Sequence, residues 1–423
     1  MTPRQGADMH DTGTARTRPI DRRRFATAAA ATLLAAAGPA PEASAARHRR
    51  WPEQFRGMWV ATVANIDWPS APGLPAHRQR AELDTLLDTA LTRRLNAVIL
   101  QVRPAADAFW PSRYEPWSRY LTGTQGRDPG WDPLGYAVRA AHDRGLELHA
   151  WFNPYRVANT ADAGALVPWH PARRHPDWVV AYGGGLYYNP GLPEVRRFVE
   201  DAMLDAVARY PLDAVHWDDY FYPYPVAGRP FDDDAAYAAY GGDFPDRASW
   251  RRHNTDLLVR ETAERIRRTR PGTRFGISPF GVWRNRSSDP LGSATTAGVQ
   301  SYDDLYADTR TWVRQGWIDY ICPQLYWSIG PGAADYAVLV PWWARTVEGT
   351  RTHLYIGEAL YKQGGSGAWS DPAELTRHLD LDARYPQVRG NAYFSAKDVA
   401  ADPTGALRRV VRDHYPTRAR VPR

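Results

Sequence analysis

Cysteine and lysine are nearly absent from this sequence of 423 residues. The one cysteine, Cys322, has no partner within the chain, so no disulfide framework holds the fold. Lys362 and Lys397 are the only lysines, and the basic charge is almost entirely arginine. Long hydrophobic runs are also missing, since no segment reaches the roughly 18 uninterrupted apolar residues of a transmembrane helix. The sequence therefore predicts a protein without a stable membrane anchor.

Motifs of several ligand classes are missing as well. No HExxH or HxxxH spacing occurs, so we expect no metal or other cofactor, although His149, His216, Asp218 and Asp219 are of the residue types that bind metals. No glycine-rich phosphate loop follows the first predicted strand, which argues against an open nucleotide-binding sheet. The formal net charge is +6, and +4 without residues 1–45, which is too small to indicate a nucleic-acid binder. No feature indicates an oligomeric state.

Residues 1–45 predict an export signal rather than part of the fold. An arginine pair in "DRRRF" precedes an Ala/Leu run, and Ala43-Ser44-Ala45 is typical of a cleavage site. An alanine-rich helix is the alternative. We expect export by the twin-arginine route to a secreted or extracytoplasmic location. Residues 46–423 contain no Ser/Gly linker and no repeat, so we expect one domain.

Eight strand-like segments alternate with helix-like segments in residues 46–423. The helix-like ones, such as 77–95, 193–210 and 249–272, have apolar residues at three- and four-residue spacing. The strand-like segments are 56–63, 97–102, 146–152, 214–218, 274–280, 319–326, 353–361 and 390–395. This count and order predict an α/β fold, a (β/α)₈ TIM barrel with enlarged βα loops.

Polar residues occupy every second position along most of these strands. In a barrel, alternate residues point inward, and the active site forms at the carboxyl ends of the strands. Aliphatic residues would fill the interior of a barrel that had only a structural role. The gathering of polar side chains near one end of the barrel therefore predicts a bound ligand. The expected inward set is Gln101, Arg103, His149, Trp151, Asn153, His216, Asp218, Ser278, Gln324, Tyr326, Asn391, Tyr393 and Ser395.

Carboxylates at strand ends are candidates for glycosidic bond cleavage. That reaction needs an acid to protonate the leaving oxygen and usually a second carboxylate across the sugar ring. Asp218, at the end of the fourth strand, is the first candidate, with Asp219 beside it. Asp107, Asp67 and Glu358 are candidates for the second carboxylate, although Glu358 shares the parity of apolar residues and would face the helices unless a bulge intervened. A turn cap or a buried ion pair is the ordinary alternative for each.

Tryptophan and tyrosine are abundant, with 18 and 23 copies. Both combine a flat apolar face with a hydrogen-bonding edge, which suits sugars. Many lie at predicted strand ends. With the polar residues there, the predicted substrate-binding set is Asn65, Asp67, Gln101, Arg103, His149, Trp151, Asn153, Tyr155, Arg156, His216, Tyr220, Tyr222, Ser278, Trp283, Gln324, Tyr326 and Trp327.

Several long segments resemble a known family. "RGMWVATVANIDWPS", "NAVILQVRPAADAFWPSRYEPWSRYLTG", "GLELHAWFNPYRV", "AVHWDDYFYP", "FGISPFGVWRN" and "LYIGEALYK" are similar to bacterial glycosyl hydrolase-like family 10. The resemblance runs from about residue 53 to 396. It implies a TIM-barrel glycoside hydrolase of the cell envelope acting on peptide-free peptidoglycan strands. By motif, it implies that Asn153, Tyr155, Arg156, Asp218, Asp219, Tyr222, Gln324, Tyr326 and Trp327 line the substrate site.

A more distant likeness concerns the fourth strand. The spacing from Asp213 to Asp218, followed by aromatics, is similar to that in chitinase-type barrels, where the acetamido group of the sugar attacks the anomeric carbon. Tyr220 stands where that motif has a glutamate, so the mechanism does not transfer outright. We therefore expect an exported glycoside hydrolase acting on a polysaccharide, namely peptidoglycan glycan strands or a related N-acetylhexosamine polymer. A non-catalytic glycan-binding barrel and a metal-dependent carbohydrate deacetylase are the alternatives.

Overall fold

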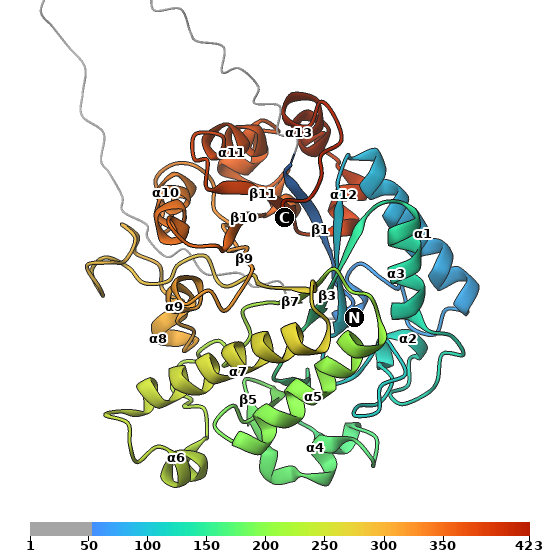
Figure 1. Ribbon diagram of the computed structural model, residues 1–423, viewed down its shortest axis with the longest axis vertical. Helices are drawn as coiled ribbons and strands as arrows, with labels where there is room; N and C mark the ends of the chain where they lie inside the picture. Colours follow the sequence, from blue (N-terminus) through green and yellow to red (C-terminus); the bar gives the residue numbers. More distant parts are fainter. Residues whose placement is uncertain (1–52) are drawn as a thin grey trace, which may run out of the picture. The chain divides into compact units, whose positions relative to one another are not determined.

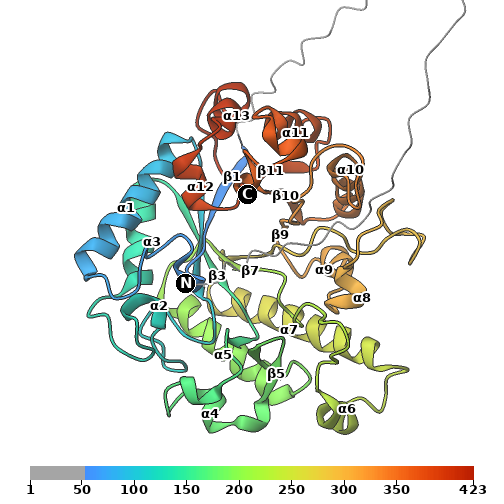
Figure 2. The ribbon, with the colours of Figure 1, turned by 180° about the vertical axis from the view of Figure 1, so that it is seen from behind.

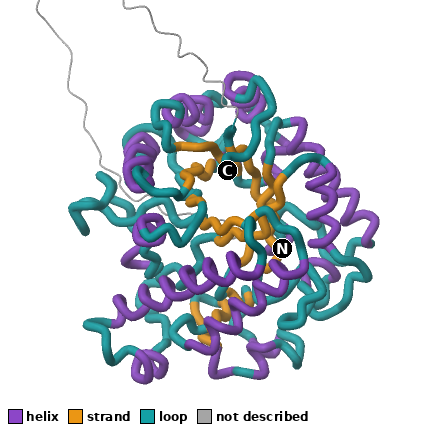
Figure 3. Tube along the Cα trace, in the orientation of Figure 1, coloured by secondary structure: helices purple, strands orange, loops and turns teal. Residues whose placement is uncertain are grey.

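Eight parallel strands close into a barrel at the centre of the computed structural model, which describes residues 53–423 (Figures 1 and 3). The predicted export signal lies outside the described residues. The strands follow one another around the barrel in chain order, and β11 pairs with β1 to close it. The predicted (β/α)₈ TIM barrel is thus confirmed. The barrel strands are β1 (Phe55–Val60), β2 (Ala97–Arg103), β3 (Glu147–Phe152), β7 (Ala214–Trp217), β8 (Arg274–Ile277), β9 (Tyr320–Ile321), β10 (His353–Glu358) and β11 (Val388–Tyr393).

Helices surround the barrel, and α5 and α7 lie side by side on its outside (Figures 1 and 2). Asp132 and Asp246 cap the amino ends of α3 and α7 by accepting backbone N–H groups. None of the helices within residues 53–423 is long and apolar enough to cross a membrane. The helices are α1 (Ala76–Thr92), α2 (Arg119–Thr122), α3 (Pro133–Asp143), α4 (Pro171–Arg174), α5 (Pro193–Arg209), α6 (Asp234–Tyr240), α7 (Arg247–Thr269), α8 (Ser301–Asp304), α9 (Thr309–Arg314), α10 (Tyr336–Val347), α11 (Glu374–Asp382), α12 (Ala396–Ala401) and α13 (Ala406–His414).

The loop between β3 and α5 is enlarged and contains a small antiparallel sheet. Its strands are β4 (Arg156–Ala158), β5 (Val179–Tyr182) and β6 (Gly185–Tyr188), with β6 in the middle. Asn153 precedes this sheet and accepts the backbone N–H of Arg156 at 3.0 Å. The sheet therefore fixes the chain just after the third barrel strand, where two predicted site residues lie.

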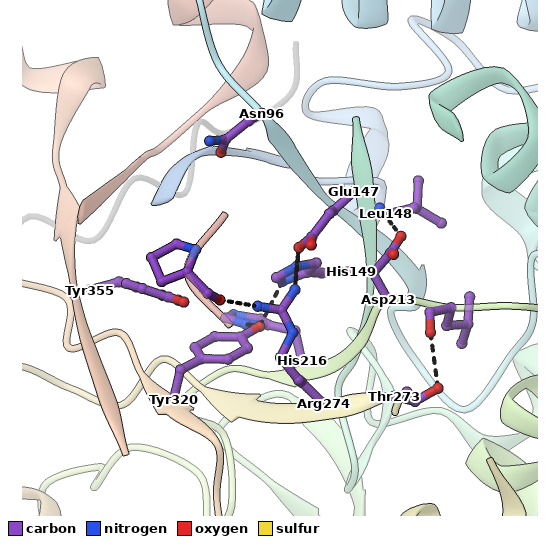
Figure 4. A network of polar contacts seen from close by, with 12 residues as sticks. Asn96, Glu147, Leu148, His149, Asp213, His216, Thr273, Arg274, Tyr320 and Tyr355 are labelled. Atoms are coloured by element: carbon purple, nitrogen blue, oxygen red, sulfur yellow. Dashed lines mark hydrogen bonds and ion pairs between the residues drawn. The ribbon is translucent and has the colours of Figure 1, made fainter. Parts of the chain in front are cut away.

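Aromatic rings and histidines fill much of the barrel interior. Phe55 stacks on Tyr355 with ring centroids 4.1 Å apart. Near the amino ends of the strands, the barrel floor, Arg274 forms a partly buried ion pair with Glu147, and His149 lies beside them (Figure 4). The carboxyl-terminal residues close the same end, because Val421 packs inside the barrel.

A β-bulge in β11 reverses the predicted direction of its side chains. Leu354 of β10 pairs with Val388, but Ile356 pairs with Asn391, so β11 has one extra residue here. Gly390 has φ +146°, and a Cβ at this position would lie 1.9 Å from a backbone oxygen of β1. After the bulge Ala392 points into the barrel. The prediction that Asn391 and Tyr393 face inward is therefore wrong.

Candidate active site

Asp218 lies directly after β7 at the mouth, the open end of the barrel formed by the carboxyl ends of its strands. It is 5 % exposed. Trp151 Nε1 donates to its carboxylate at 3.1 Å and Asn153 Nδ2 at 3.2 Å. The backbone N–H of Tyr220 donates at 3.3 Å. Neighbouring β3 thus helps to orient the carboxylate, and no Arg, Lys or His of the described residues forms an ion pair with it.

Asp219 is the second carboxylate of the site and is equally buried. The hydroxyl of Tyr224 donates to its Oδ2, and Gln324 is a further hydrogen-bond partner. The guanidinium of Arg156 lies 4.1 Å from the centre of the Tyr220 ring. Its positive charge acts on both aspartates, which gives the pair one cation without a direct ion pair.

The two carboxyl groups titrate as a coupled pair. Burial and, after it, the adjacent charge of Asp219 raise the pKa of Asp218 to about 7, against the opposing effect of Arg156. Burial also raises the pKa of Asp219, while the hydrogen bond from Tyr224 opposes that effect. The pair can therefore hold one proton near neutral pH, as a general acid must.

A chain of hydrogen bonds lies inside the barrel beneath the pair. Trp59 Nε1 donates to Nε2 of His216 at 3.2 Å, so Nδ1 of His216 carries its proton, 2.9 Å from the Tyr320 hydroxyl. That hydroxyl lies 2.9 Å from Nδ1 of His149, and Ser278 Oγ lies 2.9 Å from His216. Burial lowers the pKa of both histidines. His149, His216 and Ser278 thus lie inside the barrel. Hydrogen bonds connect His216 with Ser278 directly and with His149 through the Tyr320 hydroxyl.

Aromatic side chains succeed one another around the mouth. The ring of Tyr224 lies 5.6 Å from that of Tyr220 and 6.2 Å from that of Phe280. Trp327 follows, 5.5 Å from Phe280. All four are partly exposed, which leaves ring surface for a ligand.

Tyr326 continues this row, with ring centroids 5.9 Å from Tyr361 and 6.2 Å from Phe394. Tyr361 is 46 % exposed. Tyr361, Phe394, Tyr224 and Phe280 were not among the predicted site residues. Phe280, Tyr361 and Phe394 lie in the last two positions of predicted strands and Tyr224 follows one, so their aromatic character at these places was the available signal.

Three predicted substrate-binding residues support the loops of the mouth. Gln101 is fully buried and accepts the backbone N–H groups of Thr62 at 3.0 Å and Val63 at 2.9 Å. Asn65 donates to backbone oxygens at 2.8 and 3.0 Å. Asp67 accepts from the backbone N–H of Ala61 at 2.7 Å and from loop residues after β11. These hydrogen bonds engage all three side chains, so their role is to hold the loops in place.

Two residues of the second strand and its loop lie beneath the surface. Arg103 and Glu115 form an ion pair in which both side chains are fully buried. Arg103 also donates to the backbone oxygens of Asn153 and Pro154, so it supports the site from below and is not free for substrate. Asp107 is 1 % exposed, and burial raises its pKa to about 7. Neither residue lies open at the mouth as predicted.

Three predicted aromatic contacts belong to the packing instead. Tyr155 is fully buried in the main hydrophobic core. Tyr222 packs against Phe231, with ring centroids 5.4 Å apart. Trp283 is stacked on Trp342, 6.0 Å away. Their placement corrects the prediction, because side-chain direction on a loop depends on tertiary contacts and not on a fixed period.

Glu358 lies on the outside of the barrel wall, as its parity indicated. It is fully buried and accepts a hydrogen bond from the Tyr336 hydroxyl at 2.7 Å, and His378 of α11 lies 2.9 Å away. The candidate role as second catalytic carboxylate therefore has no geometric support. Within residues 53–423, no three His, Cys, Asp or Glu side chains are grouped so that they could hold a metal ion.

A closed (β/α)₈ barrel with a protonatable carboxyl group at its mouth provides the proton donor that glycosidic bond cleavage needs. The family model described as "Glycosyl hydrolase-like 10" matches residues 54–372. The chain is 51 % identical over 373 residues to "Glycosyl hydrolase YngK" of Bacillus subtilis, covering 87 % of this chain and 73 % of the relative. It is 42 % identical over 365 residues to "Glycosyl hydrolase DigH" of Escherichia coli K12, covering 81 % and 83 %. This chain belongs to the glycosyl hydrolase-like 10 family and is a glycoside hydrolase.

Solved structures support the fold assignment at low sequence identity. The glycoside hydrolase domain of PgaB (BpsB) from Bordetella bronchiseptica has a TM-score of 0.54 and 15 % identity, with 86 % of this chain and 98 % of that chain covered. An endo-1,4-beta-mannanase from Rhizomucor miehei has a TM-score of 0.51 and 13 % identity, with 85 % and 95 % covered. Both likenesses show the shared barrel.

Proposed function

We propose that this glycoside hydrolase cleaves the glycan strands of peptidoglycan, or a related N-acetylhexosamine polymer, outside the cytoplasm. The main support for the proposal is that Asp218 and Asp219, the two carboxylates at the mouth, are adjacent residues after one strand. Most glycoside hydrolases instead place two carboxyl groups on either side of the scissile bond, about 5–5.5 Å or about 6.5–9.5 Å apart.

The other candidate carboxylates are occupied elsewhere. Asp67 holds backbone groups, Asp107 is buried beneath its loop, and Glu358 lies behind the barrel wall. A mechanism in which the substrate supplies the nucleophile needs one acid and one orienting group, and the acetamido oxygen of an N-acetylhexosamine is such a nucleophile. The paired arrangement therefore favours an N-acetylated sugar.

In this mechanism Asp218 donates its proton to the glycosidic oxygen as the bond to the anomeric carbon breaks. The acetamido oxygen attacks that carbon, and water later opens the resulting ring. Asp219, ionised and held by Tyr224, accepts the acetamido N–H and stabilises the positive charge that develops there. The aromatic row from Tyr220 to Trp327 offers flat surfaces for successive sugar rings.

The test compares peptide-free glycan strands with the same strands after chemical removal of the N-acetyl groups. We expect release of reducing ends from the first and at least a hundredfold slower release from the second. Equal rates on both would contradict the participation of the acetamido group. Release of acetate that a chelator abolishes would indicate the deacetylase, and saturable binding without any product would indicate the non-catalytic barrel.

Export by the twin-arginine route is part of the same proposal and is tested separately. The double substitution R22K/R23K changes the arginine pair with retention of charge. We expect the variant to stay in the cytoplasm and the wild type to leave it, as measured by cell fractionation. Unchanged export of the variant would contradict this route.

A further inference from the structure

A second candidate binding site lies on the outer wall of the barrel, between α9 and α10. These helices pack against each other (Figure 1). Residues of the loop after β8 line one side of a cavity of about 260 Å³ there. Four arginines line the cavity: Arg286, Arg310, Arg314 and Arg345. They come from three different segments that only the folded chain brings together.

None of these four guanidinium groups has an acidic partner within ion-pair distance among residues 53–423. Arg284 of the same loop differs, because it forms ion pairs with Asp289 at 2.9 Å and with Asp303 at 2.8 Å. The other nearby carboxylate, Asp308, accepts hydrogen bonds from Trp283 and Thr311. Asp308 and Asp289 still act on Arg310 at longer range, but neither forms an ion pair with it.

Gathering unpaired cations around one cavity is unfavourable without an anion. Arg310 is half-buried, and its pKa is lowered by that burial and by the charge of Arg314. A guanidinium binds phosphate oxygens through two parallel N–H groups, which Lys does not do. Several such groups around one cavity form the kind of cluster that recognises phosphate.

The remaining wall of the cavity is apolar. Leu291 is 56 % exposed, and its backbone oxygen accepts the indole N–H of Trp342 at 2.9 Å. The volume exceeds that of a bare oxyanion, since one water occupies about 30 Å³ of liquid. A phosphate with an organic group attached would use both the arginines and this wall.

We propose that the cavity between α9 and α10 binds a phosphate ester, at a site separate from the mouth of the barrel. The site does not depend on the proposed glycosidase substrate. The phosphate can belong to a small soluble ester or to a polymer of phosphodiesters, because the contacts are the same.

The test measures binding by isothermal titration calorimetry to the folded protein without residues 1–45. The probes are glycerol 3-phosphate for the small ester and poly(glycerol phosphate) for the polymer. We expect saturable binding of at least one probe, weakened at least tenfold in R310Q/R314Q. The matched control is R260Q/R267Q, which removes two exposed, unpaired arginines from α7 and leaves binding unchanged.

Binding of the first probe assigns the small ester as the source, and binding of the polymer alone assigns the phosphodiester chain. Equal weakening in both double variants would overturn the proposal in favour of unspecific charge attraction. Failure of both probes to bind would also overturn it. Unchanged thermal unfolding of R310Q/R314Q confirms that a loss of binding is not a loss of fold.

Discussion

Two pairs of buried carboxylates lie on opposite sides of the barrel wall. Asp218 and Asp219 follow β7 at the mouth, whereas Glu358 and Asp382 lie behind β10, between the barrel and α11. Burial and the neighbouring carboxylate raise the pKa of one member of each pair, Asp218 to about 7 and Asp382 to about 8. Burial and a raised pKa therefore do not distinguish a reactive pair from a structural one.

The partners of the two pairs make the difference. His378 lies 2.9 Å from Glu358, the Asn391 amide donates to both rear carboxylates, and the Tyr336 hydroxyl donates to Glu358 at 2.7 Å and lies 3.0 Å from Asp382. These groups enclose the rear pair within the protein. The front pair instead receives hydrogen bonds from Trp151, Asn153 and Tyr224, and it lies beside the partly exposed rings of Tyr220 and Tyr224 at the mouth, where the proposed substrate would bind.

The largest expected effect is on catalysis by the front pair. Asp218→Asn keeps the shape and removes the proton donor, so we expect kcat to fall about 10²–10⁴-fold, the range of a general acid. Reducing-end release from glycan strands measures the change. The control is Asp232→Asn, an exposed aspartate on a loop, which should retain full activity. Full activity of Asp218→Asn would break the comparison.

The corresponding change at the rear pair should affect stability instead. Glu358→Gln leaves the buried His378 without its closest anion, and we expect the free energy of unfolding to fall by about 3–5 kcal/mol. Urea denaturation measures this, with the exposed Glu348→Gln as the control. The folded fraction should keep its kcat. A specific loss of kcat with unchanged stability would assign Glu358 to the chemistry.

The pH dependence of stability should also reveal the rear pair. Burial alone would lower the pKa of His378, but Glu358 and Glu374 outweigh it and raise the pKa to about 9. Between the ordinary histidine pKa of about 6.5 and pH 9, the folded protein binds more protons than the unfolded chain, so stability falls as pH rises. We expect a loss of about 2 kcal/mol over this window. Urea denaturation of His378→Gln should give a flatter profile, and parallel profiles would contradict the assignment.

The smallest expected effect is a shift in the pH dependence of activity, which tests the protonation of the front pair. Activity should fall as pH rises past about 7, because Asp218 must hold its proton to act as the acid. Asp219→Asn removes the neighbouring negative charge that raises this pKa. The alkaline limb of the residual activity should therefore move to lower pH by about one unit. A limb at the wild-type position would show that another group controls it.

The period of two along the strands made much of this fold predictable. His216 and Asp218 share the inward parity, and both lie where it places them. The same rule failed in β11, because the bulge at Gly390 reverses the direction of every later side chain. A glycine in a strand is a known sign of a bulge, but its position alone does not reveal which way the strand shifts.

The loops were the least predictable part. Tyr220 and Tyr222 are two residues apart on one loop, yet Tyr220 flanks the site and Tyr222 packs against Phe231. No simple period governs a loop, so side-chain direction there depends on tertiary contacts. The predictions for Asp107 and Arg103 were wrong for a related reason, because the loop after β2 folds back and buries both side chains.

The hydrogen-bonded histidines inside the barrel have a practical consequence. His149 and His216 are enclosed by fixed partners and hold neutral rings, so their ring nitrogen NMR signals should stay constant while surface imidazoles shift with pH. The one cysteine is buried and offers no accessible thiol for a probe. These two rings are therefore natural internal reporters, whose signals would disappear together when the barrel opens.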